Sequence, residues 1–528
     1  MADALEKLYG EDPGERVGEL AYHWAHATQP GDAEKAMVYA QLTGDRALAM
    51  LAPDEALRWY RDALDLLDRA PTDDLHRRAA LLLGLGDAQR LVGDAAHRET
   101  LLAAAALADD IDAVDLLVRA TLKNSRGFVS SIGGIDHERI EMVTTALARF
   151  GDADSPDRAR LLALLCAERM YDTDLDGRLA LATQAVDMAR RTGDRAALVD
   201  AIQICHETIT MPRTLELRRG WTSEACGIVD ELADPTARLF ANSFRMLTAL
   251  EAGDLATMSD AYSIYASEVD RVGQPLFDWT LAYNRVWRYT LEGDLVAAEA
   301  AVNEAFALGT MTGQPDALAF YGVQLINVRW MQGRLHELDS LIEQAVQDNP
   351  GLPAFRAVPV LAKSRAGADN EVGTHLDVEV ANNFPMPEDL GWLTAHVFWA
   401  EGAARCRHRP AAAALAELLR PWHAQIVTTH LATSGSVAHF LGRLAHGLDR
   451  FDEADQWFGE ALACHEGLRA PYFVAFTQTA WAALLSDRNQ PGDGQRARTL
   501  IDAALPVATE RGYGYLERDA RELLERFE

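Results

Sequence analysis

Cysteine is scarce in this chain of 528 residues, which excludes the common structural uses of thiols. The five cysteines are odd in number and far apart, and no two form a Cys-x-x-Cys pair. Disulfide frameworks and zinc sites both need closer and more regular spacing. We therefore expect reduced core thiols at Cys166, Cys205, Cys226, Cys406 and Cys464.

Positive charge is also in short supply. The 50 basic residues, four of them lysines, face 80 acidic ones, so the net charge is −30. Nucleic-acid phosphates and anionic lipids attract proteins through positive potential. The composition therefore argues against nucleic acid or membrane as a direct partner.

Long hydrophobic runs are missing as well. No apolar stretch reaches the roughly 18 residues of a membrane-spanning helix, and the first three residues do not open a signal peptide. Because 49% of the residues are hydrophobic, the chain has enough material for a folded core. We expect a soluble, cytoplasmic protein.

Two common catalytic motifs are also absent from the sequence. The sequence has no Gly-x-Ser-x-Gly and no His-Glu-x-x-His pattern, so it shows neither a nucleophile elbow nor that zinc motif. Four histidines are spaced seven to nine residues apart, but they are not expected to bind a metal, because no carboxylate or cysteine partners are adjacent; these histidines are His423, His430, His439 and His446. We predict no enzyme activity, no cofactor and no metal.

Glycines recur with a step of 40 residues, and this spacing is the main signal in the sequence. One row contains Gly93, Gly133, Gly253, Gly293, Gly333 and Gly373. A second row of turn residues, offset by half a period, passes through Gly151, Gly193, Asp234, Gly273 and Gly313. Two turns per period indicate two helices per repeat.

The apolar pattern between these turns is helical. In residues 274–291 large apolar side chains form a wide stripe, and the next half-repeat carries small residues that let two helices approach closely. The first helix pair is predicted at residues 32–49 and 53–69. A period of 40 lies close to those of tetratricopeptide and HEAT arrays, so we predict an all-α, tetratricopeptide-like α-solenoid.

Prolines divide this array. We predict a repeat array at residues 1–348, a proline-rich irregular break at 349–390, and further repeats at 391–528, since prolines inside helices are costly. The most strand-like stretch, residues 374–380, is interpreted as irregular or helical. Large aromatics after the break are predicted to be core residues, namely Trp392, Phe398, Trp399 and Trp422.

Several segments resemble a known family. Residues 19–27, followed by Ala36-x-x-Tyr39-Ala40 and a Trp59-Tyr60 helix pattern, resemble the tetratricopeptide-like arm of STAND ATPase regulators of the MalT-like and LuxR types and of ATPase-linked adenylate/guanylate cyclases. Residues 437–442, 451–454 and 491–498 are similar to the end of this arm. The resemblance implies an architecture, because these are packing motifs.

The chain departs from that family in its functional modules. None of its lysines follows glycine in a Gly-Lys-Ser/Thr phosphate loop, and neither a recognition helix nor a cyclase domain is evident. The resemblance therefore implies a detached arm, with a separate ATPase or regulator subunit as a possible partner.

Polar and aromatic residues one period apart predict a binding face. Stacked repeats place Arg245 beside Arg285 and Asn284 beside Gln324, on first helices that normally line the concave groove. Arginine grips carboxylates with two bonds, so an acidic ligand is favoured. The predicted groove residues are Arg245, Tyr283, Asn284, Arg285, Trp287, Arg288, Gln324 and Asn327; the alternative is that the aromatics are core and the polar residues are solvated.

Three functions remain open. The first is a non-catalytic scaffold or sensor arm that binds a protein segment or small effector in signalling or transcriptional regulation. The second is the regulatory portion of an ATPase, cyclase or DNA-binding regulator whose active modules lie on another chain. The third is an enzyme with an unrecognised site.

Overall fold

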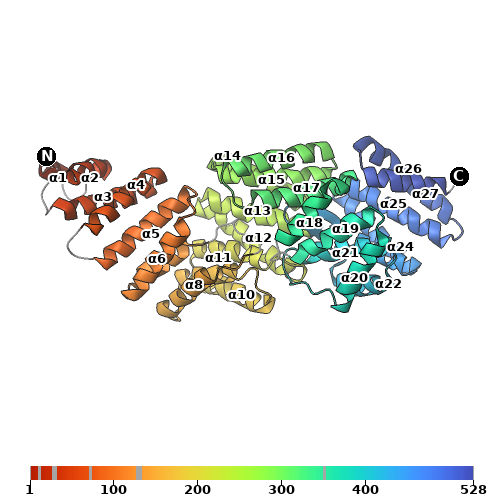
Figure 1. Ribbon diagram of the computed structural model, residues 1–528, viewed down its shortest axis with the longest axis horizontal. Coiled ribbons are helices and arrows are strands. Elements are labelled where there is room, and N and C mark those ends of the chain that lie inside the picture. Colours follow the sequence, from red (N-terminus) through yellow and green to blue (C-terminus); the bar gives the residue numbers. More distant parts are fainter. Residues whose placement is uncertain are drawn as a thin grey trace. The chain divides into compact units, whose positions relative to one another are not determined.

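The computed structural model of the chain describes residues 2–9, 14–26, 32–50, 52–69, 74–125, 134–348 and 353–526. These residues are mostly helical, and successive helices pack as antiparallel neighbours (Figure 1). The chain forms two compact units. The first contains Met1–Gly127, Ile135–Arg169 and Ala180–Ala197, and the second contains Phe128–Gly134, Met170–Leu179 and Leu198–Glu528.

The α-helices of the described residues have the following bounds: α1 Ala2–Tyr9, α2 Val17–Ala25, α3 Asp32–Ala49, α4 Pro53–Asp68, α5 Leu75–Leu91, α6 His97–Asp110, α7 Val114–Lys123, α8 His137–Phe150, α9 Pro156–Glu168, α10 Leu175–Thr192, α11 Arg195–Thr208, α12 Leu215–Leu232, α13 Pro235–Glu251, α14 Leu255–Val272, α15 Pro275–Glu292, α16 Leu295–Met311, α17 Ala317–Gln332, α18 Asp339–Asp348, α19 Val358–Arg365, α20 Asp369–Ala381, α21 Trp392–Arg405, α22 Arg409–Leu419, α23 Val437–Gly447, α24 Phe451–Gly467, α25 Pro471–Arg488, α26 Asp493–Arg511 and α27 Gly514–Glu525. Two strands, β1 Ile426–Thr428 and β2 Thr433–Ser436, pair antiparallel. The fold class is the predicted one, an all-α, tetratricopeptide-like α-solenoid.

The turns have the predicted mechanism where glycine precedes aspartate. Gly253 and Gly293 adopt left-handed φ values of 72° and 74°, which favour glycine. The following Asp254 and Asp294 then accept hydrogen bonds from backbone N–H groups in the first turn of α14 and α16. Each dipeptide ends one helix and begins the next.

The predicted positions of the helices are confirmed in part. Helices α3 and α4 match the predicted first pair, and residues 374–380 lie within helix α20. The glycine row fails at Gly373, which lies inside α20; the left-handed turn falls at Gly367 instead. Because helix α19 is only eight residues long, the turn that follows it lies at Gly367, earlier than the 40-residue spacing predicts. Gly133 lies outside the described residues.

Side chains one period apart bond to each other along the array. This spacing results from stacking, because equivalent positions of successive repeats become neighbours. Examples are Arg98 with Asp136 (38 residues apart, 2.7 Å), Arg191 with Asp154 (37, 2.7 Å), Arg409 with Asp449 (40, 2.5 Å) and His439 with Thr477 (38, 3.0 Å).

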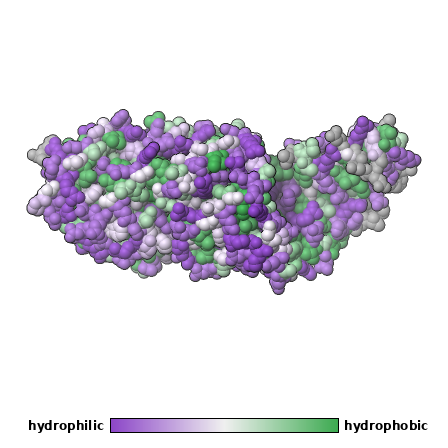
Figure 2. Space-filling model, turned by 180° about the vertical axis from the view of Figure 1, so that it is seen from behind, coloured by the Kyte–Doolittle hydropathy of each residue, from purple (hydrophilic) through white to green (hydrophobic). Residues whose placement is uncertain are grey.

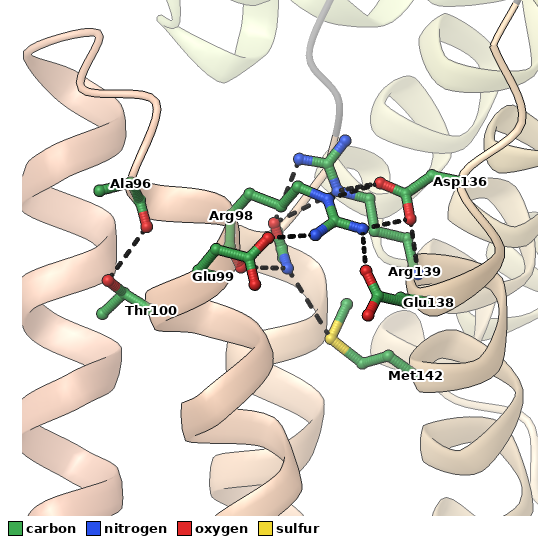
Figure 3. Close-up of polar contacts among 9 residues, drawn as sticks. Ala96, Arg98, Glu99, Thr100, Asp136, Glu138, Arg139 and Met142 are labelled. Atoms are coloured by element: carbon green, nitrogen blue, oxygen red, sulfur yellow. Dashed lines mark hydrogen bonds and ion pairs between the residues drawn. The ribbon is translucent and has the colours of Figure 1, made fainter.

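One such contact in the first unit links α6 to the start of α8 (Figure 3). The Arg98 guanidinium donates to both carboxylate oxygens of Asp136, at 2.7 and 2.8 Å, and to Glu138. Asp136 also caps α8 by accepting from the backbone N–H of Arg139. Asn124 accepts from the Arg139 side chain, so residues from three successive helical segments meet here.

Aromatic side chains fill the core of the second unit. Trp279, Trp287, Trp330 and Trp399 are among its fully buried side chains, and Trp330 lies edge-on to Phe398, Tyr472 and Phe476 at 5.8–6.2 Å between ring centroids. The predicted core role is confirmed for Phe398 and Trp399, and Trp392 packs against the same core half-buried. All five cysteines are free thiols, two of them buried.

Contacts between residues far apart in sequence close the second unit. The Tyr513 hydroxyl donates to the Gly293 carbonyl, 220 residues away, at 2.9 Å. Nearby, a Cβ on Gly333 would lie 2.7 Å from the backbone nitrogen of Tyr515, so only glycine fits this approach. Arg178 of α10 donates to the carbonyl of Glu388, 210 residues away.

Hydrophilic residues dominate the face of the molecule shown in Figure 2, and hydrophobic residues are interspersed among them. Over the described residues, no helix combines the length and the apolar character needed to cross a membrane.

Candidate functional site

A short hairpin in the second unit contacts the helices that carry the predicted groove residues. The hairpin comprises residues 426–436 and is buried on both strands. Strand β1 packs against α13 and α21, and β2 packs against α15 and α24. The hairpin therefore lies against first helices of successive repeats, where the sequence predicts a binding groove.

Two predicted residues hold this hairpin directly. Gln324 Nε2 donates to the carbonyl of Leu431 at 3.2 Å, and Asn327 Nδ2 donates to the carbonyl of Thr433 at 3.1 Å. The two carbonyls are two residues apart, and both amides come from α17. Gln324 also donates to the carbonyl of Tyr283 at 2.8 Å, which ties α17 to α15.

Three further predicted residues are buried beside these amides on α15. Trp287 Nε1 donates to Asn284 Oδ1 at 2.8 Å, and Asn284 Nδ2 donates to the carbonyl of Thr280 at 2.9 Å. Tyr283 packs edge-on against Trp279 and Phe320. The structure thus gathers Tyr283, Asn284, Trp287, Gln324 and Asn327 into one layer, which we call the amide face.

The predicted arginines lie elsewhere, on partly exposed edges of α13 and α15. Arg245 bonds Asp260 of α14 at 2.8 Å, and Arg285 lies 3.7 Å from Glu304 of α16. Arg288 pairs with Glu292 of its own helix at 2.9 Å and lies over the Tyr262 ring. The arginines bond carboxylates, as predicted for their chemistry, but these carboxylates belong to the protein itself. Their role in binding stays a prediction.

A buried charged cluster that the sequence analysis missed contacts the tip of the hairpin. Arg218 donates to both carboxylate oxygens of Glu251 at 2.8 and 2.6 Å, and His430 Nε2 lies 3.5 Å from Glu251 Oε1. Burial favours the neutral carboxyl, but the adjacent Arg218 outweighs it and holds the pKa of Glu251 below its usual range. His206, fully buried and stacked on Phe244 at 4.3 Å, has a pKa well below normal because of burial and Arg218.

The pKa of the partly buried Glu207 is shifted in the opposite direction from that of Glu251. Burial raises the pKa of its carboxyl to about 8, so it is protonated at neutral pH. Its carboxyl has no hydrogen-bond partner among the described residues. Glu207 is therefore a candidate proton donor, although a perturbed acid by itself does not define a reaction.

The four spaced histidines do not converge on one centre. His423 bonds Glu460 at 2.5 Å, His446 lies 3.0 Å from Asp487, and His439 lies 3.0 Å from the Thr477 hydroxyl. In the part of the chain that the structure describes, no three His, Cys, Asp or Glu side chains are grouped to hold a metal ion.

Comparison of the chain with known proteins gives no family assignment. No family model and no curated protein matches the chain. The crystal structure of the APC/C hetero-tetramer Cut9–Hcn1 is similar with a TM-score of 0.42 and 12% identity, over 93% of this chain and 96% of that one. The crystal structure of yeast Tom70 is similar with a TM-score of 0.31 and 14% identity, over 88% and 99%. At such values the likeness carries no functional conclusion.

Proposed function

We propose that this protein is a non-catalytic scaffold or sensor arm that binds a protein segment in extended conformation. One observation carries the proposal: the amide face already holds main-chain carbonyls of the hairpin, through Gln324 to Leu431 in its turn and Asn327 to Thr433 in β2. Side-chain amides that bond main-chain carbonyls recognise backbone shape with little dependence on sequence. Helices one period apart repeat such positions along the array.

The partner segment is proposed to bind at the arginine edges next to the amide face and to be acidic. Arg245, Arg285 and Arg288 are 31%, 42% and 46% exposed and pair with exposed carboxylates. Surface ion pairs of this kind contribute only about 0–1 kcal/mol each. Carboxylates of a partner can therefore replace them at little cost.

The sequence resemblance supports a more specific partner. We propose that the arm serves a signalling or transcription-regulating ATPase supplied by another chain. A neighbouring reading frame that encodes an ATPase module would provide the protein for a direct test. We expect the arm to bind this module and change its ATP turnover; unchanged turnover and no co-elution would contradict the proposal.

The groove proposal can be tested with peptides. Fluorescence anisotropy should show that a labelled ten-residue Asp/Glu-rich peptide binds and that its Asn/Gln counterpart does not. Arg245→Ala with Arg285→Ala should weaken binding by about tenfold, since two surface ion pairs of up to about 1 kcal/mol each are lost.

The matched control is Arg498→Ala, which removes a surface arginine paired with Asp502 in the same unit. Stability of the double variant should stay within about 0.5 kcal/mol of the parent, as is usual for exposed positions. Equal peptide affinity for parent and double variant would refute the site. A large loss of stability would show that the two arginines are structural.

A further inference from the structure

A polar pocket of about 330 Å³ lies in the second unit, apart from the amide face. The C-terminal ends of α19, α21 and α23 and the start of α20 form its walls. Charged and polar side chains line most of it, including Ser364, Asp369, Arg405, Arg407, Arg443 and His446. We call it the arginine pocket.

Arginines outnumber carboxylates at the base of this pocket. Arg365 bonds Glu401 at 2.6 Å and lies 3.4 Å from Asp519. Arg405 shares Asp519 at 3.3 Å, and Arg443 shares Glu401 at 3.4 Å. Within this cluster three guanidinium groups therefore share two carboxylates, and the one remaining positive charge is partly offset by the Asp369 carboxylate at the rim.

The remaining positive charge lies at the pocket wall. Each guanidinium has five N–H donors in a planar fork. Among the described residues, Arg443 contacts Glu401 and Arg405 bonds Asp519. Helix C-terminal ends favour cations, which explains why arginines gather here. The Nε donor of Arg443 is buried without a hydrogen-bond partner among these residues.

The pKa shift of Arg443 is consistent with positive charge in the pocket. Burial, together with the neighbouring Arg405 and Arg365, lowers the pKa of Arg443 despite the attraction of Glu401. A bound anion would relieve this repulsion. His446, whose pKa burial and Arg443 lower, is neutral at pH 7 and adds no charge.

We propose that the arginine pocket binds a small acidic metabolite through a carboxylate or phosphate group held by Arg405 and Arg443. Arginine forks match both oxyanions with paired hydrogen bonds. The volume lies at the lower end of the range for small-molecule sites, about 300–1,000 Å³, so it accommodates more than a bare ion.

Two residues at the rim adjust this binding. Arg407 is 65% exposed and bonds Asp487 at 2.8 Å, so its guanidinium can turn toward a ligand. Asp369 is exposed and repels an anion. Loss of this carboxylate should therefore strengthen binding, which an unspecific effect of substitution would not do.

Isothermal titration calorimetry with inorganic phosphate and, separately, with succinate tests the proposal and identifies the oxyanion. At least one should bind the parent protein. Arg405→Gln should weaken binding about ten- to a hundredfold, and Asp369→Asn should tighten it about two- to fivefold. Arg498→Gln, an exposed substitution outside both proposed sites, is the control and should change neither anion's affinity.

Each outcome of these titrations supports or overturns the proposed anion site. No heat with either anion at millimolar concentration overturns the proposal, as does an equal effect of Arg405→Gln and Arg498→Gln. If Arg405→Gln does not fold, Arg407→Gln replaces it, and Asp369→Asn still has to tighten binding. Peptide binding without anion binding leaves the proposed function intact and removes only this site.

Discussion

At the residue scale, burial changes the chemistry of Glu207. Its carboxyl has a pKa of about 8 in the folded chain, against 4.5 in an unfolded one. A raised carboxyl pKa means that the folded state resists ionisation. The folded state therefore loses stability as pH rises from 4.5 to 8.

Glu207→Gln should remove this pH-dependent loss of folded-state stability. The variant should melt at a higher temperature than the parent at pH 8 and at the same temperature at pH 4.5, as measured by differential scanning calorimetry. Glu216→Gln, an exposed substitution on α12, should leave the melting temperature unchanged at both pH values. Equal melting of the Glu207 variant and its parent at pH 8 would show that this carboxyl is ionised without penalty.

At the element scale, Asp136 holds the start of helix α8. Its carboxylate caps the helix and receives two bonds from Arg98 of α6 (Figure 3). The hydrogen bond from Arg98 lowers the pKa of Asp136 to about 2, against the effect of burial. Its contribution to stability is therefore complete above pH 3.8 and is lost as pH falls toward 2.

Asp136→Ala should destabilise the first unit by about 0.5–2 kcal/mol from the lost cap alone. Urea unfolding followed by circular dichroism measures the change. Asp115→Ala is the matched control, because Asp115 is exposed in the first turn of α7 and pairs only across one helical turn. A cost no larger than that of the control would mean that α8 does not depend on this cap.

At the scale of the whole molecule, buried histidines make stability depend on pH. Burial lowers the pKa of five histidines in the second unit, to about 4 for His396 and about 3 for His465; the other three are His206, His439 and His446. An unfolded histidine has a pKa near 6.5, so acid protonates the unfolded chain first. The stabilising contribution is complete above pH 6.5 and decreases as pH falls below it.

We expect each of these histidines to reduce the free energy of unfolding by up to about 1.4 kcal/mol per pH unit below pH 6.5. Glu207 and Asp389, whose pKa values are raised by burial, oppose the trend with fewer groups. Nine of the eleven tryptophans lie in the second unit, so urea unfolding followed by tryptophan fluorescence reports on it. Equal unfolding midpoints at pH 7.5 and 5.5 would contradict this expectation.

The sequence predicts most of the helices because their turns carry local signals. Gly253–Asp254 and Gly293–Asp294 define helix ends through their own left-handed φ values and cap hydrogen bonds. The hairpin at residues 426–436 has no comparable signal, since its bonds come from α17, about 107 residues earlier. Sequence patterns lose reliability where distant side chains decide the backbone.

In the candidate site, too, contacts that follow from the repeat spacing can be predicted from the sequence, whereas contacts that depend on helix packing cannot. The spacing of 40 residues predicts Asn284 beside Gln324, and Gln324 bonds the carbonyl of the preceding residue, Tyr283. It does not reveal that Arg245 and Arg285 bond Asp260 and Glu304, because these pairs depend on how neighbouring helices meet. The same spacing of 40 residues relates Arg365 to Arg405, so the arginine pocket also has a periodic signal in the sequence.

The bond from Tyr513 to Gly293 has a consequence for synthesis in the cell. Contacts within one period can form as soon as two repeats leave the ribosome, whereas this bond joins residues 220 positions apart. The first unit can therefore mature while translation continues. The second unit cannot complete its core until the C-terminal helices emerge, because α15 packs against α25 and α17 packs against α27.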